Sequence, residues 1–192
     1  MRVRPATLAA LLLTALAAAG CGPLDATQSG GVQAEPVELL SVLPSPDSLR
    51  GEPARAADPA ALQLAFTGSA DPELAEIVAL RDPAAAGVRT WSDPSGATLT
   101  AAASVWGSHL TATGVGSDLA TRLVGEGGAA WTPSSIPASR GARLDQDGRR
   151  ELRLAYSVGP NSFYVRATGD IPEEIVTRTL DRMITVQRGA GG

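Results

Sequence analysis

The N-terminus constrains the fold most, because it separates about twenty residues from the part of the chain that can fold. Arg2 and Arg4 precede an apolar stretch from about Ala6 to Ala19, and small residues follow it. This order is typical of a secretory signal peptide. At ~1.5 Å per residue the stretch spans roughly 21 Å, less than the ~30 Å hydrocarbon core of a bilayer, so a cleaved signal is favoured over a permanent membrane span.

Cys21 is the only cysteine of the chain and stands directly after Ala18-Ala19-Gly20. These residues resemble the lipobox of bacterial lipoproteins, in which the thiol is diacylglycerylated and the chain is cleaved before the cysteine. The resemblance covers residues 1–22 and implies a diacylglyceryl anchor at Cys21 that holds the protein to the cell membrane on its extracytoplasmic face. Two acyl chains suit stable anchoring, because a single chain binds a membrane only reversibly. The alternative is an ordinary signal cut near Ala19 that releases a protein with a free thiol.

The residue counts exclude several classes of protein. One Cys and one His leave no disulfide framework, no four-ligand zinc site and no pair of cysteines for redox chemistry. All 16 basic residues are arginine, which excludes chemistry that depends on lysine. Without residues 1–20 the net charge changes from −4 to −6, which argues against a nucleic-acid partner. We expect neither a metal ion nor another cofactor.

The rest of the chain is predicted to form one domain on a tether. Residues 22–36 (GPLDATQSGGVQAEP) are small and polar, with no apolar periodicity, as in flexible linkers. After them, residues 37–43 are apolar enough for a strand or a short helix. The predicted parts are a signal peptide (1–20), the lipidated cysteine with its tether (21–36), a single α+β domain (37–188) and a disordered tail (189–192).

Local signals predict two helices and a hairpin in the first half of the domain. Asp71-Pro72 is typical of a helix start and predicts a helix over residues 72–81. Residues 87–106 predict a hairpin that turns at Asp93-Pro94-Ser95-Gly96. Ser117 and Asp118 predict the start of a helix that ends at Gly125, with Leu119, Leu123 and Val124 on its apolar side.

The second half predicts another hairpin and a closing helix. The alternation of apolar residues predicts two strands, 151–158 and 163–168, joined by a turn at Gly159-Pro160-Asn161. Residues 170–173 resemble a capping box. The following stripe is typical of a core-facing helix and consists of Ile175, Val176, Leu180, Met183, Ile184 and Gln187. These elements predict an α+β fold, an antiparallel sheet built from hairpins with helices packed on one face.

The hairpin motif Trp91-x-Asp93-x-x-Gly96, the middle helix and the closing strand and helix are also similar to small lipoproteins of GC-rich Gram-positive bacteria. This resemblance covers about residues 70–188. It implies no particular activity.

His109 is the only histidine, and no diagnostic catalytic partner accompanies it in the sequence. We interpret it as a residue of a turn or of a helix start. The sequence contains no GxSxG, HExxH or Walker motif.

Asp145-Gln146-Asp147-Gly148 resembles the start of a calcium-binding loop. The twelfth position of such a loop is Tyr156 and not a carboxylate, so Asp147-Gly148 is interpreted as a turn.

Five arginines form the strongest local charge feature. With Arg153 predicted to point outward beside Glu151, they could form a patch that contacts an anion, a lipid headgroup or a partner. The alternative is a strand edge kept soluble by charge. The five residues are Arg140, Arg143, Arg149, Arg150 and Arg153.

Trp91, Trp106 and Trp131 are the three tryptophans. They could line a pocket for an apolar or sugar ligand, or they could supply the bulky part of an alanine-rich core.

These patterns favour a non-enzymatic lipoprotein of the cell envelope that binds another envelope component, either a protein or a small ligand. A carrier of lipids or other hydrophobic ligands is the second hypothesis. An envelope hydrolase is disfavoured by the single histidine and the missing motifs. A deep apolar pocket would favour the carrier, and a shallow face without a cavity would favour the partner-binding module.

Overall fold

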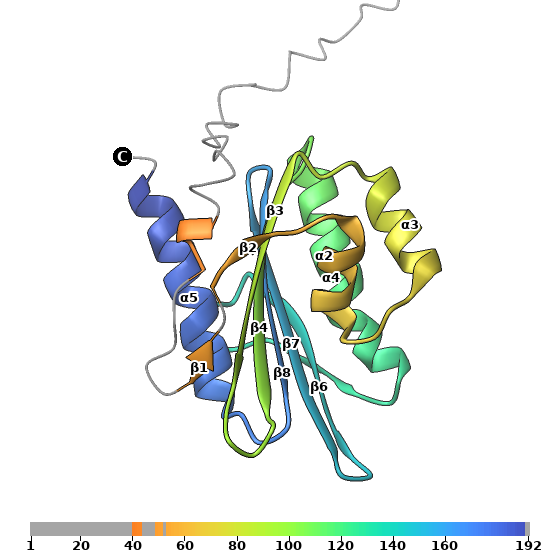
Figure 1. Cartoon of the computed structure of the whole chain (residues 1–192), viewed down its shortest axis with the longest axis vertical. Coiled ribbons are helices and arrows are strands. Elements are labelled where there is room, and N and C mark those ends of the chain that lie inside the picture. Colours follow the sequence, from red (N-terminus) through yellow and green to blue (C-terminus); the bar gives the residue numbers. More distant parts are fainter. Residues whose placement is uncertain (1–39, 44–48, 52, 191–192) are drawn as a thin grey trace, which may run out of the picture.

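The computed structural model describes residues 40–43, 49–51 and 53–190, so the predicted signal peptide, Cys21 and the predicted tether lie outside the described residues. The strands form an eight-stranded sheet in the order β1-β3-β4-β8-β7-β6-β5, and β2 also pairs with β3 (Figure 1). The strands are β1 (Arg50–Gly51), β2 (Arg55–Ala56), β3 (Ala85–Ser92), β4 (Thr98–Val105), β5 (Ala129–Trp131), β6 (Arg140–Gln146), β7 (Arg149–Val158) and β8 (Asn161–Thr168). The helices are α2 (Pro59–Thr67), α3 (Pro72–Leu80), α4 (His109–Gly125) and α5 (Glu173–Ala190). Among these helices, none combines the length and apolar character that a membrane span requires.

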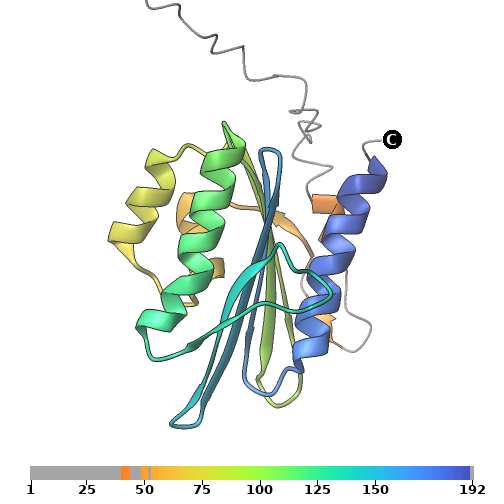
Figure 2. The same ribbon diagram turned by 180° about the vertical axis from the view of Figure 1, so that it is seen from behind.

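Helices cover both faces of the sheet. The α5 helix packs on one face, and α2, α3 and α4 lie on the other (Figures 1 and 2). The α+β class and the antiparallel sheet are therefore confirmed, but the prediction that the helices pack on one face is wrong. Strand β4 explains the difference, because Ala101 and Ala103 belong to the core under α5 whereas Ala102 belongs to the core on the opposite side. Small apolar side chains on both faces of a central strand let helices approach it from either side.

The first predicted hairpin is confirmed as β3 and β4. Asp93 fixes its turn, because its Oδ1 accepts hydrogen bonds from the backbone N–H groups of Ser95 at 2.8 Å and Ala97 at 3.0 Å. Gly96 follows with φ +87°, a conformation that favours glycine. The loop therefore turns at the predicted residues.

The predicted helix at Asp71-Pro72 is confirmed as α3, and a second helix with the same start was not predicted. Asp71 Oδ1 accepts from the backbone N–H of Leu74 at 3.0 Å, and Asp58 Oδ1 accepts from that of Ala61 at 2.7 Å. In both cases a proline follows the capping aspartate. The Asp58-Pro59 pair was thus a usable signal for α2.

The observed N-cap of helix α4, Ser108, lies nine residues before the predicted cap Ser117. Ser108 caps the helix by accepting from the backbone N–H of Thr111 at 3.1 Å, so the prediction of a start at Ser117 is wrong. Gly116 lies where α4 approaches the sheet, and a Cβ added there would stand 3.0 Å from Ser162 Oγ. Val124 is exposed, whereas Leu119 and Leu123 are buried as predicted.

The second predicted hairpin is confirmed as β7 and β8, and β6 precedes it as a strand that was not predicted. Gln146 and Arg149 pair across a two-residue turn formed by Asp147 and Gly148, with φ values of +55° and +75°. The predicted turn is therefore correct. The stripe of α5 is also confirmed, since Val176, Leu180 and the later members of the stripe are buried.

Candidate functional site

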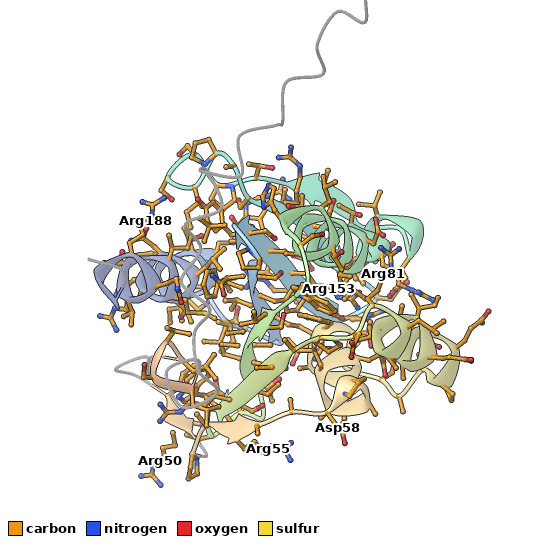
Figure 3. All side chains as sticks on the ribbon, turned by 90° about the horizontal axis from the view of Figure 1, so that it is seen from above. Arg50, Arg55, Asp58, Arg81, Arg153 and Arg188 are labelled. Carbon is orange, nitrogen blue, oxygen red and sulfur yellow. The ribbon has the colours of Figure 1, made fainter. Side chains whose placement is uncertain are left out.

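Arg153 and Glu151 lie inside the molecule, under the helices on the α4 side of the sheet. Each side chain is only 1% exposed. Arg153 Nε donates a hydrogen bond to Glu151 Oε1 at 2.7 Å. Figure 3 shows Arg153 within the body of the domain, whereas Arg50, Arg55 and Arg188 lie at its periphery. The prediction of an outward Arg153 is wrong, because its face of the sheet is covered by helices rather than by water.

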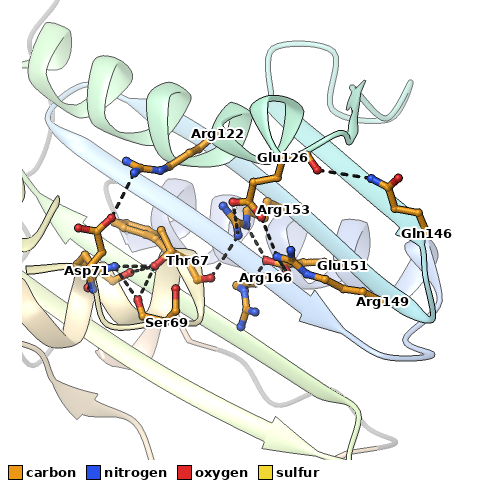
Figure 4. Close-up of polar contacts among 12 residues, drawn as sticks. Thr67, Ser69, Asp71, Arg122, Glu126, Gln146, Arg149, Glu151, Arg153 and Arg166 are labelled. Carbon is orange, nitrogen blue, oxygen red and sulfur yellow. Dashed lines mark hydrogen bonds and ion pairs between the residues drawn. The ribbon is translucent and has the colours of Figure 1, made fainter. Parts of the chain in front are cut away.

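Two further arginines hold Glu151 (Figure 4). Arg166 Nε donates to Glu151 Oε1 at 2.7 Å, and Arg149 Nη2 donates to Glu151 Oε2 at 2.7 Å. Arg149 also pairs with Glu126, the C-terminal capping residue of α4, at 2.9 Å. We call Glu126, Arg149, Glu151, Arg153 and Arg166 the arginine cluster.

The cluster places two like charges directly opposite each other. Arg153 on β7 and Arg166 on β8 are paired residues in the antiparallel ladder. Such a pair destabilises a sheet unless an opposite charge lies between the two side chains. Glu151 Oε1 supplies this charge, since it accepts a hydrogen bond from both arginines.

The arginines keep Glu151 ionised although it is buried. Burial alone would raise the pKa of this carboxyl group. The hydrogen bond and charge of Arg166, together with Arg149 and Arg153, outweigh burial and hold the pKa of Glu151 below its usual value. The carboxylate is therefore charged at neutral pH.

The C-terminal end of α2 completes the surroundings of the cluster. Arg153 Nη2 donates a hydrogen bond to the carbonyl oxygen of Thr67 at 3.2 Å. The hydroxyl of Tyr164 donates a hydrogen bond to the carbonyl oxygen of Phe66 at 2.5 Å. Burial raises the pKa of Tyr164, so its hydroxyl keeps the proton that it donates. Carbonyl groups at the end of a helix carry partial negative charge and favour cations there. The helix end thus helps to hold Arg153.

Several N–H groups of the arginine cluster have no partner among the described residues. Arg153 Nη1 is buried without a hydrogen bond to any described residue. Arg166 uses Nε for Glu151, and within the described part of the chain neither of its Nη atoms makes a hydrogen bond. An arginine offers five N–H donors and no acceptor. The cluster therefore has donors available for a further acceptor.

An open hollow of about 610 Å³ lies beside these donors. Its lining joins the loop after α2, the end of α4 and the ends of β7 and β8. Gly68, with φ +75°, leaves room for Arg166, because a Cβ at this position would stand 2.0 Å from Arg166 Nη2. The lining residues are Thr67, Gly68, Ser69, Glu126, Gly148, Arg149, Arg150, Glu151, Arg153, Arg166, Thr168 and Gly169.

The five arginines predicted as one patch are divided between different surroundings. Arg149 and Arg153 belong to the arginine cluster. Arg150 contributes to the lining of the hollow, but it pairs with Asp170. Arg143 pairs with Glu173 of α5 at 3.5 Å, and Arg140 donates to the carbonyl oxygen of Ser139. A single outward patch of the five is therefore not formed.

The three tryptophans do not share a pocket. Trp91 is buried in the core under α5, and Trp106 is buried in the core on the opposite face. Trp131 is half-buried and lines a separate surface hollow of about 700 Å³ with Glu173, Glu174 and Asp181 among its other residues. The alternative, that tryptophans fill an alanine-rich core, is correct for Trp91 and Trp106.

His109 is the first residue of α4, as the interpretation of a helix start predicts. Its side chain is exposed, and Nδ1 lies 2.9 Å from the carbonyl oxygen of Gly159. Because a carbonyl oxygen can only accept a hydrogen bond, Nδ1 donates in this contact.

Among the described residues, no group of three or more His, Cys, Asp or Glu side chains is placed to hold a metal ion.

Sequence reasoning missed Arg166 and Glu126 and gave Glu151 no part in binding. The signal for Arg166 was its position within the otherwise apolar run from Phe163 to Ala167. A charged residue inside such a run requires a partner when both faces of the strand are covered.

No protein-family model matches the chain, and no curated protein matches it. Among solved structures, the extracellular domain of PknH from Mycobacterium tuberculosis is similar, with a TM-score of 0.51 and 10% sequence identity. The match covers 81% of this chain and 92% of that chain. The likeness is one of fold.

Proposed function

We propose that this protein is a lipid-anchored extracytoplasmic binding module of the cell envelope, without enzymatic activity, and that the hollow beside the arginine cluster is its ligand site. The observation that carries this proposal is the pair Arg153 and Arg166, opposed on neighbouring strands and held by one carboxylate. Apolar side chains of similar volume can be as stabilising in such a position as a buried ion cluster. The charged arrangement beside an open hollow therefore favours recognition of an anion.

The location rests on two separate observations. Residues 1–22 resemble the signal and lipobox of bacterial lipoproteins, and the fold is similar to an extracellular domain of a bacterial protein. A diacylglyceryl group on Cys21 would hold the domain at the extracytoplasmic face of the cell membrane. The partner would then be a protein or a small ligand of the envelope.

The lining of the hollow favours a charged ligand over a hydrophobic one. Four arginines and two glutamates contribute to it. A carrier of lipids requires an apolar cavity, and neither this hollow nor the acidic hollow beside Trp131 has that character. His109 is not part of either lining, so a catalytic role for the hollow would lack the usual general base.

Photo-crosslinking in intact cells tests this function. A photoreactive residue at Ser69, which is exposed at the hollow, should capture a discrete envelope component. The same residue at Ala79, exposed on α3, is the control and should not capture that component. The captured species should disappear when Arg166→Gln is added. Identical products at both positions, or products that survive Arg166→Gln, would remove the hollow as the ligand site.

A further inference from the structure

Arg166 lines the hollow with two terminal nitrogens, Nη1 and Nη2, that make no hydrogen bond to the described residues. Its Nε is engaged by Glu151, and its guanidinium lies against Gly68, where a Cβ would stand between 2.0 and 2.4 Å from Nη1, Nη2 and the carbon between them. The side chain is 14% exposed, so solute can reach it from the hollow. The two terminal nitrogens of one guanidinium form a planar fork that matches two oxygens of a carboxylate.

The charge of the arginine cluster indicates how much negative charge the hollow accepts. Arg149, Arg153 and Arg166 are balanced by Glu126 and Glu151, which leaves one positive charge among these described residues. Arg150 adds none, because Asp170 pairs with it. One negative charge would therefore neutralise the cluster, whereas a dianion would add repulsion from the two glutamates.

Arg153 strengthens this field without reaching the ligand through a hydrogen bond of its own. Its side chain is 1% exposed and it holds Glu151 in place, so it acts as a positioning residue. Its Nη1 has no described partner, and a buried cation with an unpartnered N–H makes the surroundings more favourable to an anion.

From these observations we propose that the hollow binds a ligand through a single carboxylate, whose two oxygens accept hydrogen bonds from Nη1 and Nη2 of Arg166. This inference rests on the proposed function in one respect, that the hollow is a ligand site. It adds the chemical class of the ligand, a monocarboxylate rather than a doubly charged phosphate.

The test uses the purified full chain in mild detergent and three small probes. Acetate carries the proposed group, acetamide has nearly the same shape without charge, and inorganic phosphate is the competing oxyanion. Binding is followed through the ¹H–¹⁵N signals of the arginine Nε–H groups. Acetate should shift the Arg166 signal in a saturable way, acetamide should leave it unchanged, and phosphate should require about tenfold higher concentration or more, since the site neutralises one charge.

Variants test whether acetate binding depends on the planar guanidinium fork of Arg166 or only on its positive charge. Arg166→Lys keeps the charge but loses the planar fork, and it should weaken acetate binding about tenfold. Arg143→Gln, in the exposed pair with Glu173, is the control and should leave acetate binding unchanged. Ser69→Asp places a negative charge at the hollow without altering the arginine cluster, and it should weaken acetate binding where Ser69→Asn does not. The Ser69 pair keeps the test decisive if Arg166→Lys fails to fold.

The outcomes distinguish the ligand class from the site. Tighter binding of phosphate than of acetate would overturn the monocarboxylate and leave the hollow as a ligand site. Equal shifts with acetate and acetamide, or acetate binding unaffected by both Arg166→Lys and Ser69→Asp, would also overturn it. No response to any of the three probes would overturn the hollow as a ligand site together with the inference that depends on it.

Discussion

Replacing Glu151 by Gln should be among the most destabilising conservative changes in the domain. The carboxylate accepts three hydrogen bonds of 2.7 Å from three different arginines and is itself 1% exposed. A Gln side chain has the same shape but offers one oxygen, and its amide group would place N–H donors against guanidinium donors. Removing one partner of a buried ion pair costs about 3–5 kcal/mol, because the other charge stays buried.

This loss can be measured by thermal and urea unfolding at neutral pH. For a domain of this size 1 kcal/mol corresponds to about 2–4 °C, so Glu151→Gln should lower Tm by about 6–20 °C. The matched control is Arg143→Gln, which breaks the exposed ion pair with Glu173 and should cost less than about 1 kcal/mol. Equal losses for the two variants would refute the argument that burial makes the arginine cluster strong.

The pH dependence gives this prediction a second measurement. Because the pKa of Glu151 is lowered in the folded protein, its contribution to stability is complete above the ordinary carboxyl range and is lost as the pH falls through the folded pKa. Glu151→Gln lacks this contribution at every pH. The difference in unfolding free energy between the two proteins should therefore narrow below about pH 4. A difference that stays constant on acidification would mean that the carboxylate charge is not the origin of the loss.

Three other changes test the anchor, the core and the absence of catalysis. Cys21→Ser should move the protein from the membrane fraction to the soluble fraction, and a variant that stays in the membrane pellet with unchanged mobility would remove the lipid anchor. Ile184→Ala, at a buried position of α5, should lower the free energy of unfolding by about 2–5 kcal/mol in thermal melts. Asp181→Ala, exposed on the same helix, should lower it by less than about 1 kcal/mol. Equal shifts of Tm would contradict the assigned helix face. His109→Gln should complement a deletion strain nearly as well as the native protein, and loss of function in a folded variant would favour catalysis or a ligand-proton role.

Much of the fold was predictable because its strongest local signals are short-range. The Asp71 cap, the Asp93 turn and the stripe of α5 each depend on residues a few positions apart. Strand β6 was missed because its sequence RGARLDQ carries little apolar pattern. Its strand character comes from pairing with β7 and from the contact of Ala142 and Leu144 with Leu123 of α4, which no local signal reveals.

The candidate site was predictable only in part, because its members meet through strand order. The alternation in β7 correctly separates Arg153 from Leu152 and Leu154, but it cannot tell which of the two faces meets water. That decision depends on α2 and α4, which lie far from β7 in sequence. Arg149 and Arg153 were therefore found as candidates while their surroundings were not.

The position of Arg166 in the sequence already indicates a buried ion cluster. Arg166 follows Phe163, Tyr164 and Val165 and precedes Ala167, so it stands in a strand whose other residues are mostly apolar. In a strand with helices on both faces, such an arginine cannot reach water easily and requires an acid nearby. The same reasoning applies to Arg153, and the acid that serves both is Glu151, two residues away from Arg153. One carboxylate holds two opposed arginines, so it cannot accept hydrogen bonds from all of their N–H groups. The remaining N–H donors border the hollow where we place the ligand.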